Sequence, residues 1–334
     1  MRRVLKRLAE SAPSVALMEW FLALWLELVS ALKPVDNFAA KIAVVVPAYN
    51  VEQYIAQAMR SLKAQRYRNL KVILVDDHCT DKSIEKARPF QSKIDLTIVR
   101  GKHDGLGAAR NTGVDQVSDV DYIIFLDSDD VMSPGTLSRM ARLATRFGAD
   151  IVNGQSAKFV GLGIFPRRDT RFLYRGRKEE LLTLNDEPRM IFDSTPWNKL
   201  IRWDFWQANK LEWPLHVYFE DLILSSKMMT LGAKVVLTPK IIYLWRVRVG
   251  AEKSITQTHA QIRTLRDRVS AARIATGYMK EALAAKRISA RTFEVFQEKL
   301  RTHDLPIYLP HYQNPTGEAK ELMDEFALLA GVTK

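Results

Sequence analysis

Four strongly apolar runs that alternate with segments of helical spacing constrain the fold of this chain more than any other feature. The runs are KIAVVVPAYN (41–50), LKVILVDD (70–77), DLTIVR (95–100) and DYIIFLDSDD (121–130). Continuous apolar runs of this length are typical of strands that are buried on both faces of a sheet. Because strands that alternate with helices form right-handed βαβ units, the pattern predicts an α/β fold with a mostly parallel central sheet flanked by helices.

Three of the four runs end in acidic residues or in a polar turn. The first ends in PAYN (47–50), the second in Asp76 and Asp77, and the fourth in DSDD (127–130). The carboxyl ends of parallel strands meet at one edge of a sheet, and ligands bind there. We therefore expect these polar ends to gather at a single ligand-binding edge.

The acidic run 127–130 has two interpretations. Carboxylates this close repel one another unless a positive group lies between them. Asp127 and Asp129 point the same way on an extended chain, and a turn after the strand brings Asp130 round as well. The run is either a solvated turn or a divalent-metal site, and the convergence of polar strand ends favours the metal site. Oxygen ligands suit Mg²⁺ or Mn²⁺, which take their remaining ligands from water and phosphate.

Composition narrows the class of protein. The chain has 334 residues, 47% of them hydrophobic, so it is long enough for one large or two modest domains. Its single cysteine, Cys79, excludes an internal disulfide and a multi-thiolate metal site. The net charge of +12 favours a polyanionic partner. The basic residues lie in flanks without an aromatic-interleaved motif, so we expect no nucleic-acid partner.

The two flanks are predicted to be helical. SVALMEWFLALWLELVSAL (14–32) places Glu19 and Glu27 on one stripe, which favours an amphipathic helix over a membrane span. The helix packs on the protein itself or on a second copy, or it lies in the plane of an anionic membrane. The basic residues that precede this helix are Arg2, Arg3, Lys6 and Arg7. Residues 260–301 are also helical in pattern and strongly basic.

Six motifs in order resemble family 2 glycosyltransferases with the nucleotide-sugar-dependent GT-A fold. They are VVVPAYNVEQYIAQAMRSLKAQ, VILVDDHCTDKS, GLGAARNTGV, YIIFLDSDD, WNKLI and YFEDLILSSKM. The later YLWRVRVGAEKSIT resembles the subset that builds teichoic acids, capsules and other surface polymers. The match predicts a nucleotide-binding half at 41–150 and an acceptor half at 151–256. The segments 1–40 and 257–334 lie outside it.

The resemblance implies a role for each matching residue. Asp77, with Asp76 beside it, would hold the uracil and ribose of a UDP-sugar, and Asp129 would bind Mn²⁺ or Mg²⁺ bridging the diphosphate. Asp221, the second residue of its acidic pair, would be the general base. The other nucleotide-sugar contacts implied are Pro47, Tyr49 and Asn50 at the base, Arg110, Asp127 and Ser128 at the nucleotide, Glu220 beside the general base, and Arg246, Arg248 and Ser254 over the diphosphate.

The reaction implied is inverting transfer to a hydroxyl of a glycan, a polyol-phosphate polymer or a lipid-linked acceptor. Because UDP-sugars are cytosolic and such acceptors are carried on lipid, we expect a cytoplasmic protein, peripheral on the inner face of the plasma membrane. One departure is visible after the second strand, where the family commonly has a small residue and then Ser, and this chain has His78 and Cys79.

Other interpretations stay open. A nucleotidyltransferase also uses strand-end acids and a metal, but it normally has a Gly-rich basic loop after the first strand, where this chain has PAYN. GKHDGLGAARNTG (101–113) instead follows the third strand, and places small residues where a backbone approaches phosphate. A catalytically inactive carbohydrate- or membrane-binding scaffold would not need to keep the acids. Trp197 and Trp245 supply either a face for sugar or core packing.

Overall fold

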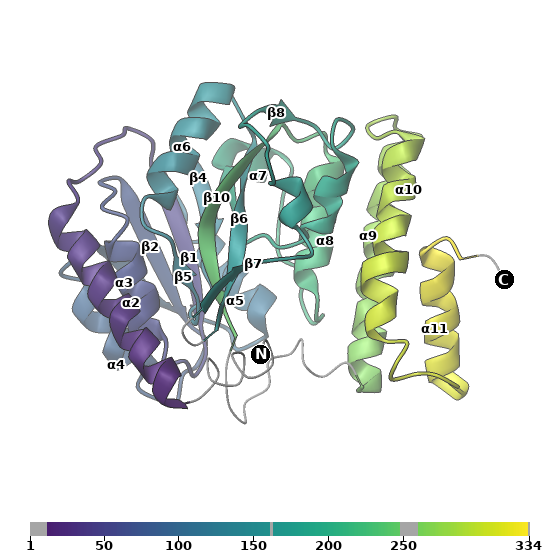
Figure 1. The fold of residues 1–334 in the computed structure, drawn as a ribbon, viewed down its shortest axis with the longest axis horizontal. Helices are drawn as coiled ribbons and strands as arrows, with labels where there is room; N and C mark the ends of the chain where they lie inside the picture. The colour runs from purple at the N-terminus through teal and green to yellow at the C-terminus, as the bar shows by residue number, and fades with distance from the viewer. Residues whose placement is uncertain (1–11, 161–162, 248–259, 333–334) are drawn as a thin grey trace. The chain divides into compact units, whose positions relative to one another are not determined.

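The computed structural model describes residues 12–160, 163–247 and 260–332, and it divides into two compact units (Figure 1). The first unit comprises Met1–Leu181, Trp197–Lys210 and Val236–Gly250. The second comprises Leu182–Pro196, Leu211–Val235 and Ala251–Lys334. The predicted boundaries at 40/41 and 256/257 stay predictions.

One mixed sheet dominates the first unit. In the described part of the chain, the strand order along its main path is β3-β2-β1-β4-β9-β6-β10-β5, with β7 paired to β6 and β8 to β10. The strands are β1 (Ile42–Ala48), β2 (Leu70–Asp76), β3 (Asp95–Arg100), β4 (Tyr122–Phe125), β5 (Val131–Met132), β6 (Ile151–Val160), β7 (Gly163–Pro166), β8 (Leu181–Leu182), β9 (Lys199–Arg202) and β10 (Val235–Arg246).

The four strands that the apolar runs predict form the parallel half of this sheet. β1 pairs in parallel with β2 on one side and with β4 on the other, and β3 continues the sheet beyond β2. All seven residues of β1 are buried, which is why its sequence is continuously apolar. The pairs that join β4 to β9, β9 to β6, β6 to β7 and β10 to β5 are antiparallel.

Helices pack on this sheet through small and apolar side chains. The helices of the first unit are α2 (Ala12–Leu32), α3 (Ile55–Lys63), α4 (Ser83–Ala87), α5 (Leu106–Val114), α6 (Thr136–Phe147) and α7 (Trp203–Ala208), with 3₁₀ turns η1 (Arg88–Phe90) and η2 (Arg171–Leu173). α5 packs on β1 and β2, and Gly113 permits this approach because a Cβ there would lie 2.4 Å from Cγ1 of Val45. α2 lies beside α3 (Figure 1) and contributes Leu22 and Leu26 to a buried cluster with Phe159 and Leu244.

The second unit is largely helical. It contains η3 (Pro188–Phe192), α8 (Glu220–Thr230), α9 (Ile262–Ala284), α10 (Ala290–Lys299), the π-helical turn η5 (Leu300–Asp304), η6 (Leu305–Ile307) and α11 (Gly317–Leu329). α9 packs against α8 on one side and α11 on another, and α10 packs on η3. Ser289 caps α10, since its side chain accepts a hydrogen bond from the backbone N–H of Thr292.

Helix α4 begins without a side-chain cap, because its N-cap residue is Lys82. The carboxylate of Asp81 instead accepts from the backbone N–H of Ser83 at 2.9 Å, inside the first turn. In the described ranges, no helix is both long and apolar enough to cross a membrane.

Candidate functional site

The polar strand ends lie at one edge of the parallel half-sheet. Ala48 at the end of β1 pairs with Asp76 at the end of β2, and Val45 pairs with Phe125 of β4. The ladder continues one step past each strand, because the N–H of Asp77 donates to the carbonyl of Ala48 at 2.9 Å. The first part of the candidate site is therefore built by β1, β2 and β4, as the sequence pattern predicts.

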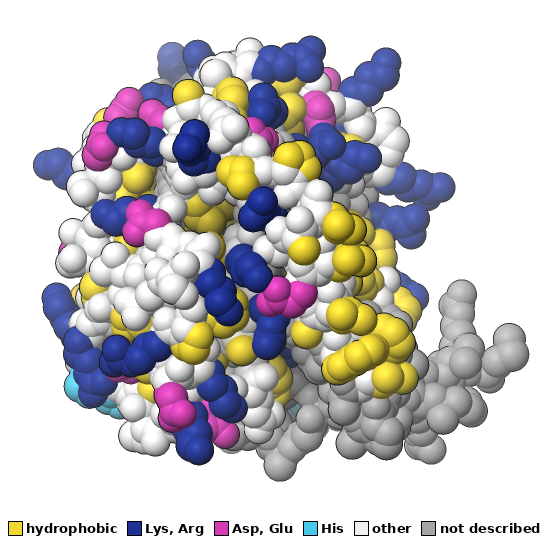
Figure 2. Space-filling view, turned by 90° about the vertical axis from the view of Figure 1, so that its left-hand side faces the viewer, with side chains coloured by type: hydrophobic (Ala, Val, Ile, Leu, Met, Phe, Trp, Pro, Cys, Tyr) yellow, Lys and Arg dark blue, Asp and Glu magenta, His cyan; other side chains and the backbone are white. Residues whose placement is uncertain are grey.

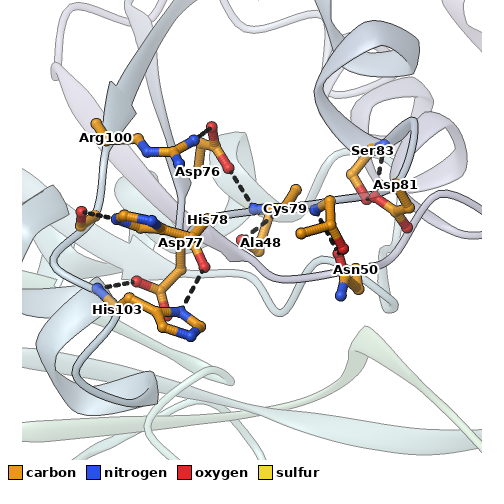
Figure 3. A network of polar contacts seen from close by, with 12 residues as sticks. Ala48, Asn50, Asp76, Asp77, His78, Cys79, Asp81, Ser83, Arg100 and His103 are labelled. Carbon is orange, nitrogen blue, oxygen red and sulfur yellow. Dashed lines mark hydrogen bonds and ion pairs between the residues drawn. The ribbon is translucent and has the colours of Figure 1, made fainter.

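Asp76 is a structural carboxylate as well as a candidate ligand. Its Oδ1 accepts from the backbone N–H of Cys79 at 2.9 Å, and its Oδ2 lies 2.5 Å from Nη1 of Arg100 (Figure 3). Burial opposes ionisation, but the Cys79 N–H and the Arg100 guanidinium outweigh it and hold the pKa of Asp76 below its usual value. Burial raises the pKa of the Cys79 thiol, and its Sγ donates to the Ala48 carbonyl, so this cysteine is not an activated nucleophile.

Asp77 is held by the loop that follows β3. Its Oδ1 accepts from the backbone N–H of His103 at 2.8 Å, and the Nδ1–H of His103 donates to its carbonyl at 3.1 Å (Figure 3). Gly101 passes so close that a Cβ there would lie 2.5 Å from Oδ1 of Asp77. The Nε2–H of His78 donates to the Gly101 carbonyl at 3.2 Å. These contacts fix the carboxylate that the sequence predicts to hold the nucleoside.

Three rings line this end of the edge. The ring centroids of Tyr49 and His103 lie 5.2 Å apart, as do those of His78 and His103. The Tyr49 ring is 52% exposed, whereas Pro47 is buried in β1. Asn50 turns its side chain to the loop after β2, where its Oδ1 accepts from the backbone N–H of Thr80 at 2.8 Å.

Sequence reasoning missed Arg100, Gly101 and His103. Its only signal was that GKHDG follows a strand and has small residues, which pointed to phosphate rather than to Asp77. His78 and His103 both have a positive φ, of 66° and 57°, which is uncommon for non-glycine residues and concentrates at functional sites. No periodicity in the sequence reports a backbone conformation of this kind.

Arg110 reaches the acidic run from α5. Its side chain is only 3% exposed, and its Nη2 lies 2.6 Å from Oδ1 of Asp127, whose side chain is 26% exposed. The protein therefore places its own cation against the first of the three acids. Ser128, expected to touch the nucleotide, is 6% exposed.

Asp130 does not join the other two acids, contrary to the expectation that the turn brings it round. It is 1% exposed, its Oδ2 accepts from the Tyr243 hydroxyl at 2.7 Å, and its Oδ1 accepts from the Arg246 N–H at 2.7 Å. Burial raises the pKa of Asp130 well above its usual value, and the charges of Asp129 and Asp127 raise it further. The repulsion among the acids is relieved partly by this inward turn and by Arg110.

The Arg246 side chain is buried in this structure and is hydrogen-bonded to other protein groups. It is 6% exposed, its Nε donates to the Asp129 carbonyl at 2.5 Å, and its Nη2 donates to Oε1 of Gln57. Its guanidinium also lies 4.8 Å from the ring centroid of Phe159. The Arg246 side chain thus stabilises the acidic turn through the Asp129 carbonyl. Arg248 and Ser254, predicted beside it, lie outside the described residues.

The two tryptophans lie in different surroundings. Trp197 is 8% exposed and stacks on Tyr243, with ring centroids 4.1 Å apart and planes at 27°. Core packing is therefore the role that the structure gives it, and it orients the tyrosine that bridges Asp127 and Asp130. The Lys158 ammonium lies 5.1 Å from the centroid of the half-buried Trp245.

The residues after β4 fit a metal that arrives with its substrate. In the chain as described, no group of three or more His, Cys, Asp or Glu side chains is placed to hold a metal ion. Asp127 and the half-buried Asp129 supply carboxylate oxygens, which suit Mg²⁺ or Mn²⁺. Such ions commonly use one or two carboxylates and complete their shell with water and substrate phosphates. The donor set fits that arrangement rather than a preformed all-protein cage.

The predicted base lies in the second unit. Glu220 and Asp221 form the first turn of α8, and Oδ1 of Asp221 accepts from the N–H of Leu222 at 2.8 Å. The N-cap residue of α8 is Phe219, with a left-handed φ of 66°. Both acids are half-buried.

Comparisons with known proteins bear on this edge. Residues 43–207 match the sequence model of the family described as Glycosyl transferase family 2. Glycosyltransferase GlyA of Streptococcus pneumoniae serotype 4 is 28% identical over 242 residues, 69% of this chain and 34% of GlyA. The poly(ribitol-phosphate) beta-N-acetylglucosaminyltransferase TarS of Staphylococcus aureus is 26% identical over 220 residues, 64% of this chain and 37% of TarS. This chain thus spans little more than a third of either relative's length.

Solved structures agree on the architecture. S. aureus TarS residues 1–349 in complex with UDP-GlcNAc matches with a TM-score of 0.56 at 18% identity, covering 87% of this chain and 90% of that one. Mannosyltransferase PcManGT from Pyrobaculum calidifontis, in complex with GDP-Man and Mn²⁺, matches with a TM-score of 0.55 at 18% identity, covering 96% and 92%. At this identity the likeness concerns the fold, and the α/β fold predicted from the sequence is confirmed.

Proposed function

Because this chain carries a glycosyltransferase family 2 domain at residues 43–207 on a GT-A fold, we propose that it transfers a sugar from a UDP-sugar to an acceptor hydroxyl. The observation that carries the proposal is the edge where β1, β2 and β4 end. It gathers a fixed carboxylate at Asp77, an exposed ring at Tyr49, and the Arg110–Asp127 pair. We propose that they serve as a nucleoside-binding acid, a stacking surface and a cation for phosphate.

The reaction is a single displacement at the anomeric carbon. The acceptor hydroxyl oxygen bonds to this carbon, the bond from the carbon to the diphosphate oxygen breaks, and UDP leaves with the bonding electrons. Asp221 takes the hydroxyl proton, a contribution of roughly 10²–10⁴-fold to rate. One base and no covalent intermediate give inversion. Glu220 lies beside the base in the first turn of α8.

Charge that develops on the leaving diphosphate needs a positive counterpart. A divalent ion held by Asp129 would neutralise that charge. From the chain itself, Arg110 lies beside Asp127 at the same edge, and we propose that it contributes to nucleotide binding there. We also propose that Arg246, Arg248 and Ser254 contact the diphosphate. For Arg246 this contact requires its guanidinium to leave Gln57.

The donor and the metal are tested by one experiment. The purified protein is offered UDP-glucose, UDP-N-acetylglucosamine, UDP-galactose and, because a structural neighbour holds GDP-Man, GDP-mannose, each with Mn²⁺, Mg²⁺ or EDTA. We expect UDP release from one UDP-sugar with metal and not with EDTA. A ligand at 100 times its dissociation constant adds about 2.7 kcal/mol of stability, so thermal protection identifies the same donor. Release from the GDP-sugar alone, or turnover in EDTA, would contradict the proposal.

The acceptor is proposed to be a surface polymer or its lipid-linked precursor. The similarity to TarS, a poly(ribitol-phosphate) beta-N-acetylglucosaminyltransferase, supports this proposal. A nucleotidyltransferase remains the rival enzyme, and it predicts release of pyrophosphate from a nucleoside triphosphate rather than of UDP. An inactive scaffold predicts binding without release. The screen above, extended by a nucleoside triphosphate and a pyrophosphate assay, distinguishes all three.

We further propose that the protein works as a peripheral protein on the inner face of the plasma membrane, docked through α2. One side of this helix packs into the first unit through Leu22 and Leu26, which are 6% and 0% exposed. The other side is an apolar band, yellow in Figure 2, of large side chains that are 44% to 74% exposed. Its members are Leu17, Trp20, Phe21, Leu24, Trp25, Leu28 and Leu32. Trp-rich faces of this kind suit a lipid–water interface.

Charge beside the apolar band favours anionic lipid over a second copy of the chain. Glu27 of α2 is neutralised by Lys63 at 2.7 Å and Arg60 at 3.5 Å, and Asp36 by Arg142 at 2.8 Å. Basic residues next to these pairs are Lys33, Arg66 and Arg68. A symmetric dimer across α2 would bring two such basic borders together. Each Lys or Arg near an anionic surface is worth about 1 kcal/mol.

Vesicle co-sedimentation tests the docking. Binding is measured on phosphatidylglycerol-containing vesicles at low and high salt for the full chain, for Trp20→Ala with Trp25→Ala, and for Ile164→Ala with Phe165→Ala. The last pair is the matched control, since both side chains are exposed apolar groups on β7. We expect salt-sensitive binding that only the α2 variant loses. A dimer without lipid that the α2 variant dissociates would assign the band to a second copy.

A further inference from the structure

The segment before the proposed base has a strained backbone conformation, which contacts from other parts of the protein must stabilise. Phe219 precedes Glu220 and Asp221 directly and has a φ of 66°, and His216 three residues earlier has a φ of 58°. Bulky side chains seldom occupy this left-handed region unless surrounding contacts impose it. The carbonyl of Phe219 accepts the N–H of Leu222 at 3.1 Å, so α8 begins from this conformation. The direction of Asp221 therefore depends on Phe219.

Two arginines of α9 cover the aromatic residues of this segment. The guanidinium carbon of Arg268 lies 4.9 Å from the ring centroid of Phe219, and that of Arg263 lies 5.0 Å from the ring of Tyr218. They differ in their surroundings, because the Arg268 side chain is 10% exposed and that of Arg263 is 68% exposed. Cation–π contacts are strongest where water is excluded, so Arg268 is the effective one.

Arg268 is itself held by the buried carboxylate of Asp304, which Lys299 also contacts. Its Nη2 lies 2.6 Å from Oδ1 of Asp304, and Oδ2 of the same carboxylate lies 2.7 Å from Nζ of Lys299. Lys299 and Asp304 are 3% and 6% exposed. Burial lowers the pKa of Lys299, while the charges of Asp304 and, more weakly, Asp221 raise it. The negative charge of Asp221 is thus among those that the buried cluster experiences.

We propose that Arg268 is a positioning residue for the catalytic base: clamped by Asp304, it holds Phe219 in the left-handed conformation that directs Asp221. The inference rests on the proposed function, because it takes Asp221 as the base. It assigns a role in the reaction to the C-terminal helices, which lie beyond the family match at 43–207. Arg268 acts through Phe219 and does not touch substrate.

The first test needs no substrate. Hydrogen–deuterium exchange is compared for the unaltered chain, Arg268→Met, Arg268→Lys and the control Arg266→Met. Arg266 lies on the same helix in an exposed pair with Glu318 at 2.7 Å. We expect loss of protection confined to residues 216–224 in Arg268→Met, partial recovery in Arg268→Lys, and none in the control. Unchanged protection of 216–224 in Arg268→Met would overturn the proposal.

The second test separates positioning from general stability. UDP release from the donor is measured together with UDP affinity. Because misplacing a catalytic group by about 1 Å costs about 100-fold, we expect kcat to fall about 10–100-fold in Arg268→Met with UDP affinity within about 3-fold. Parallel loss of both would indicate a merely structural role and refute positioning. If Arg268→Met does not fold, Phe219→Leu removes the ring face and is expected to give the same split.

Asp221→Asn distinguishes the two levels of the argument. If this variant keeps its kcat, the assignment of the base is wrong. If it loses kcat while Arg268→Met and Phe219→Leu both keep theirs, the base stands and the positioning role is wrong. A double variant of Arg268 and Phe219 should be no slower than either single one, since both remove the same contact.

Discussion

Replacing Gly101 by Ala should disturb nucleotide binding through one carboxylate. A Cβ at this position would lie 2.5 Å from Oδ1 of Asp77, closer than Cβ atoms approach other heavy atoms in proteins, and 3.1 Å from Cα of Asp77, tighter than most such contacts. The carboxylate must swing away, which breaks its 2.8 Å hydrogen bond from the His103 N–H. A hydrogen bond to a charged group is worth about 1.5–3 kcal/mol. If Asp77 binds the nucleoside in its present orientation, the dissociation constant for UDP should rise about 10–100-fold.

Calorimetric titration with UDP and Mn²⁺ measures this change, and a thermal scan follows the fold. Crowding at the Asp77 backbone should also cost about 1–3 kcal/mol of stability. Gly277→Ala is the matched control, because Gly277 is an exposed position of α9 where a Cβ meets nothing within 4 Å. The control should bind UDP normally and be slightly more stable. A folded Gly101→Ala protein with UDP affinity within about twofold of the parent would refute the argument that this orientation governs binding.

Three further predictions concern acidic residues. Asp129→Asn should abolish metal-dependent UDP release while the thermal midpoint of the metal-free protein holds or rises slightly, because a repulsive charge beside Asp127 and Asp130 is removed; full turnover by the variant would exclude Asp129 as the metal ligand. Asp221→Asn should lower turnover about 100-fold or more with UDP affinity within a few-fold, measured by steady-state kinetics and titration, and the reverse pattern would place the base elsewhere. Burial opposes ionisation of Asp304, but Arg268 and Lys299 hold its pKa below the usual value, so it adds stability above about pH 4 that is lost as pH falls through its folded-state pKa. Asp304→Asn should therefore cost about 3–5 kcal/mol at neutral pH, and a constant difference in denaturant midpoint down to strongly acid pH would contradict this linkage.

Three strands of the parallel half, β1, β2 and β4, were predictable because they are buried on both faces, whereas the edge strand β3 is mostly exposed or half-buried. In the sequence, β1, β2 and β4 each appear as an apolar run, and the polar residues after these runs indicate the edge where the candidate site lies. β9 has only four residues, and its place between β4 and β6 depends on partners far along the chain. Local patterns carry no signal for such pairings.

Within the site, the residues were easier to predict than their orientations. Asp77 and Asp127 lie at the expected edge, but the inward turn of Asp130 requires Tyr243 and Arg246 of β10. Trp197 is packed on Tyr243 for the same long-range reason. His103 was missed because its contact with the Asp77 carboxylate is made by its backbone N–H, which every residue type except proline supplies. Spacing identifies side chains that carry chemistry, while the groups that orient them come from distant segments.

The hydrogen bond between the acidic turn and β10 limits where this chain can be truncated. Asp127 and Tyr243 are 116 positions apart, yet the N–H of one donates to the hydroxyl of the other. The stretch that family comparison recognises stops at residue 207, before β10, and starts at 43, after α2 has supplied Leu22 and Leu26 to the core. A recombinant fragment limited to that stretch would bury the Asp130 carboxyl with neither of its donors and open the cluster around Phe159. The recognisable segment is therefore shorter than the cooperative folding unit, and fragments for crystallisation or assay need both neighbours.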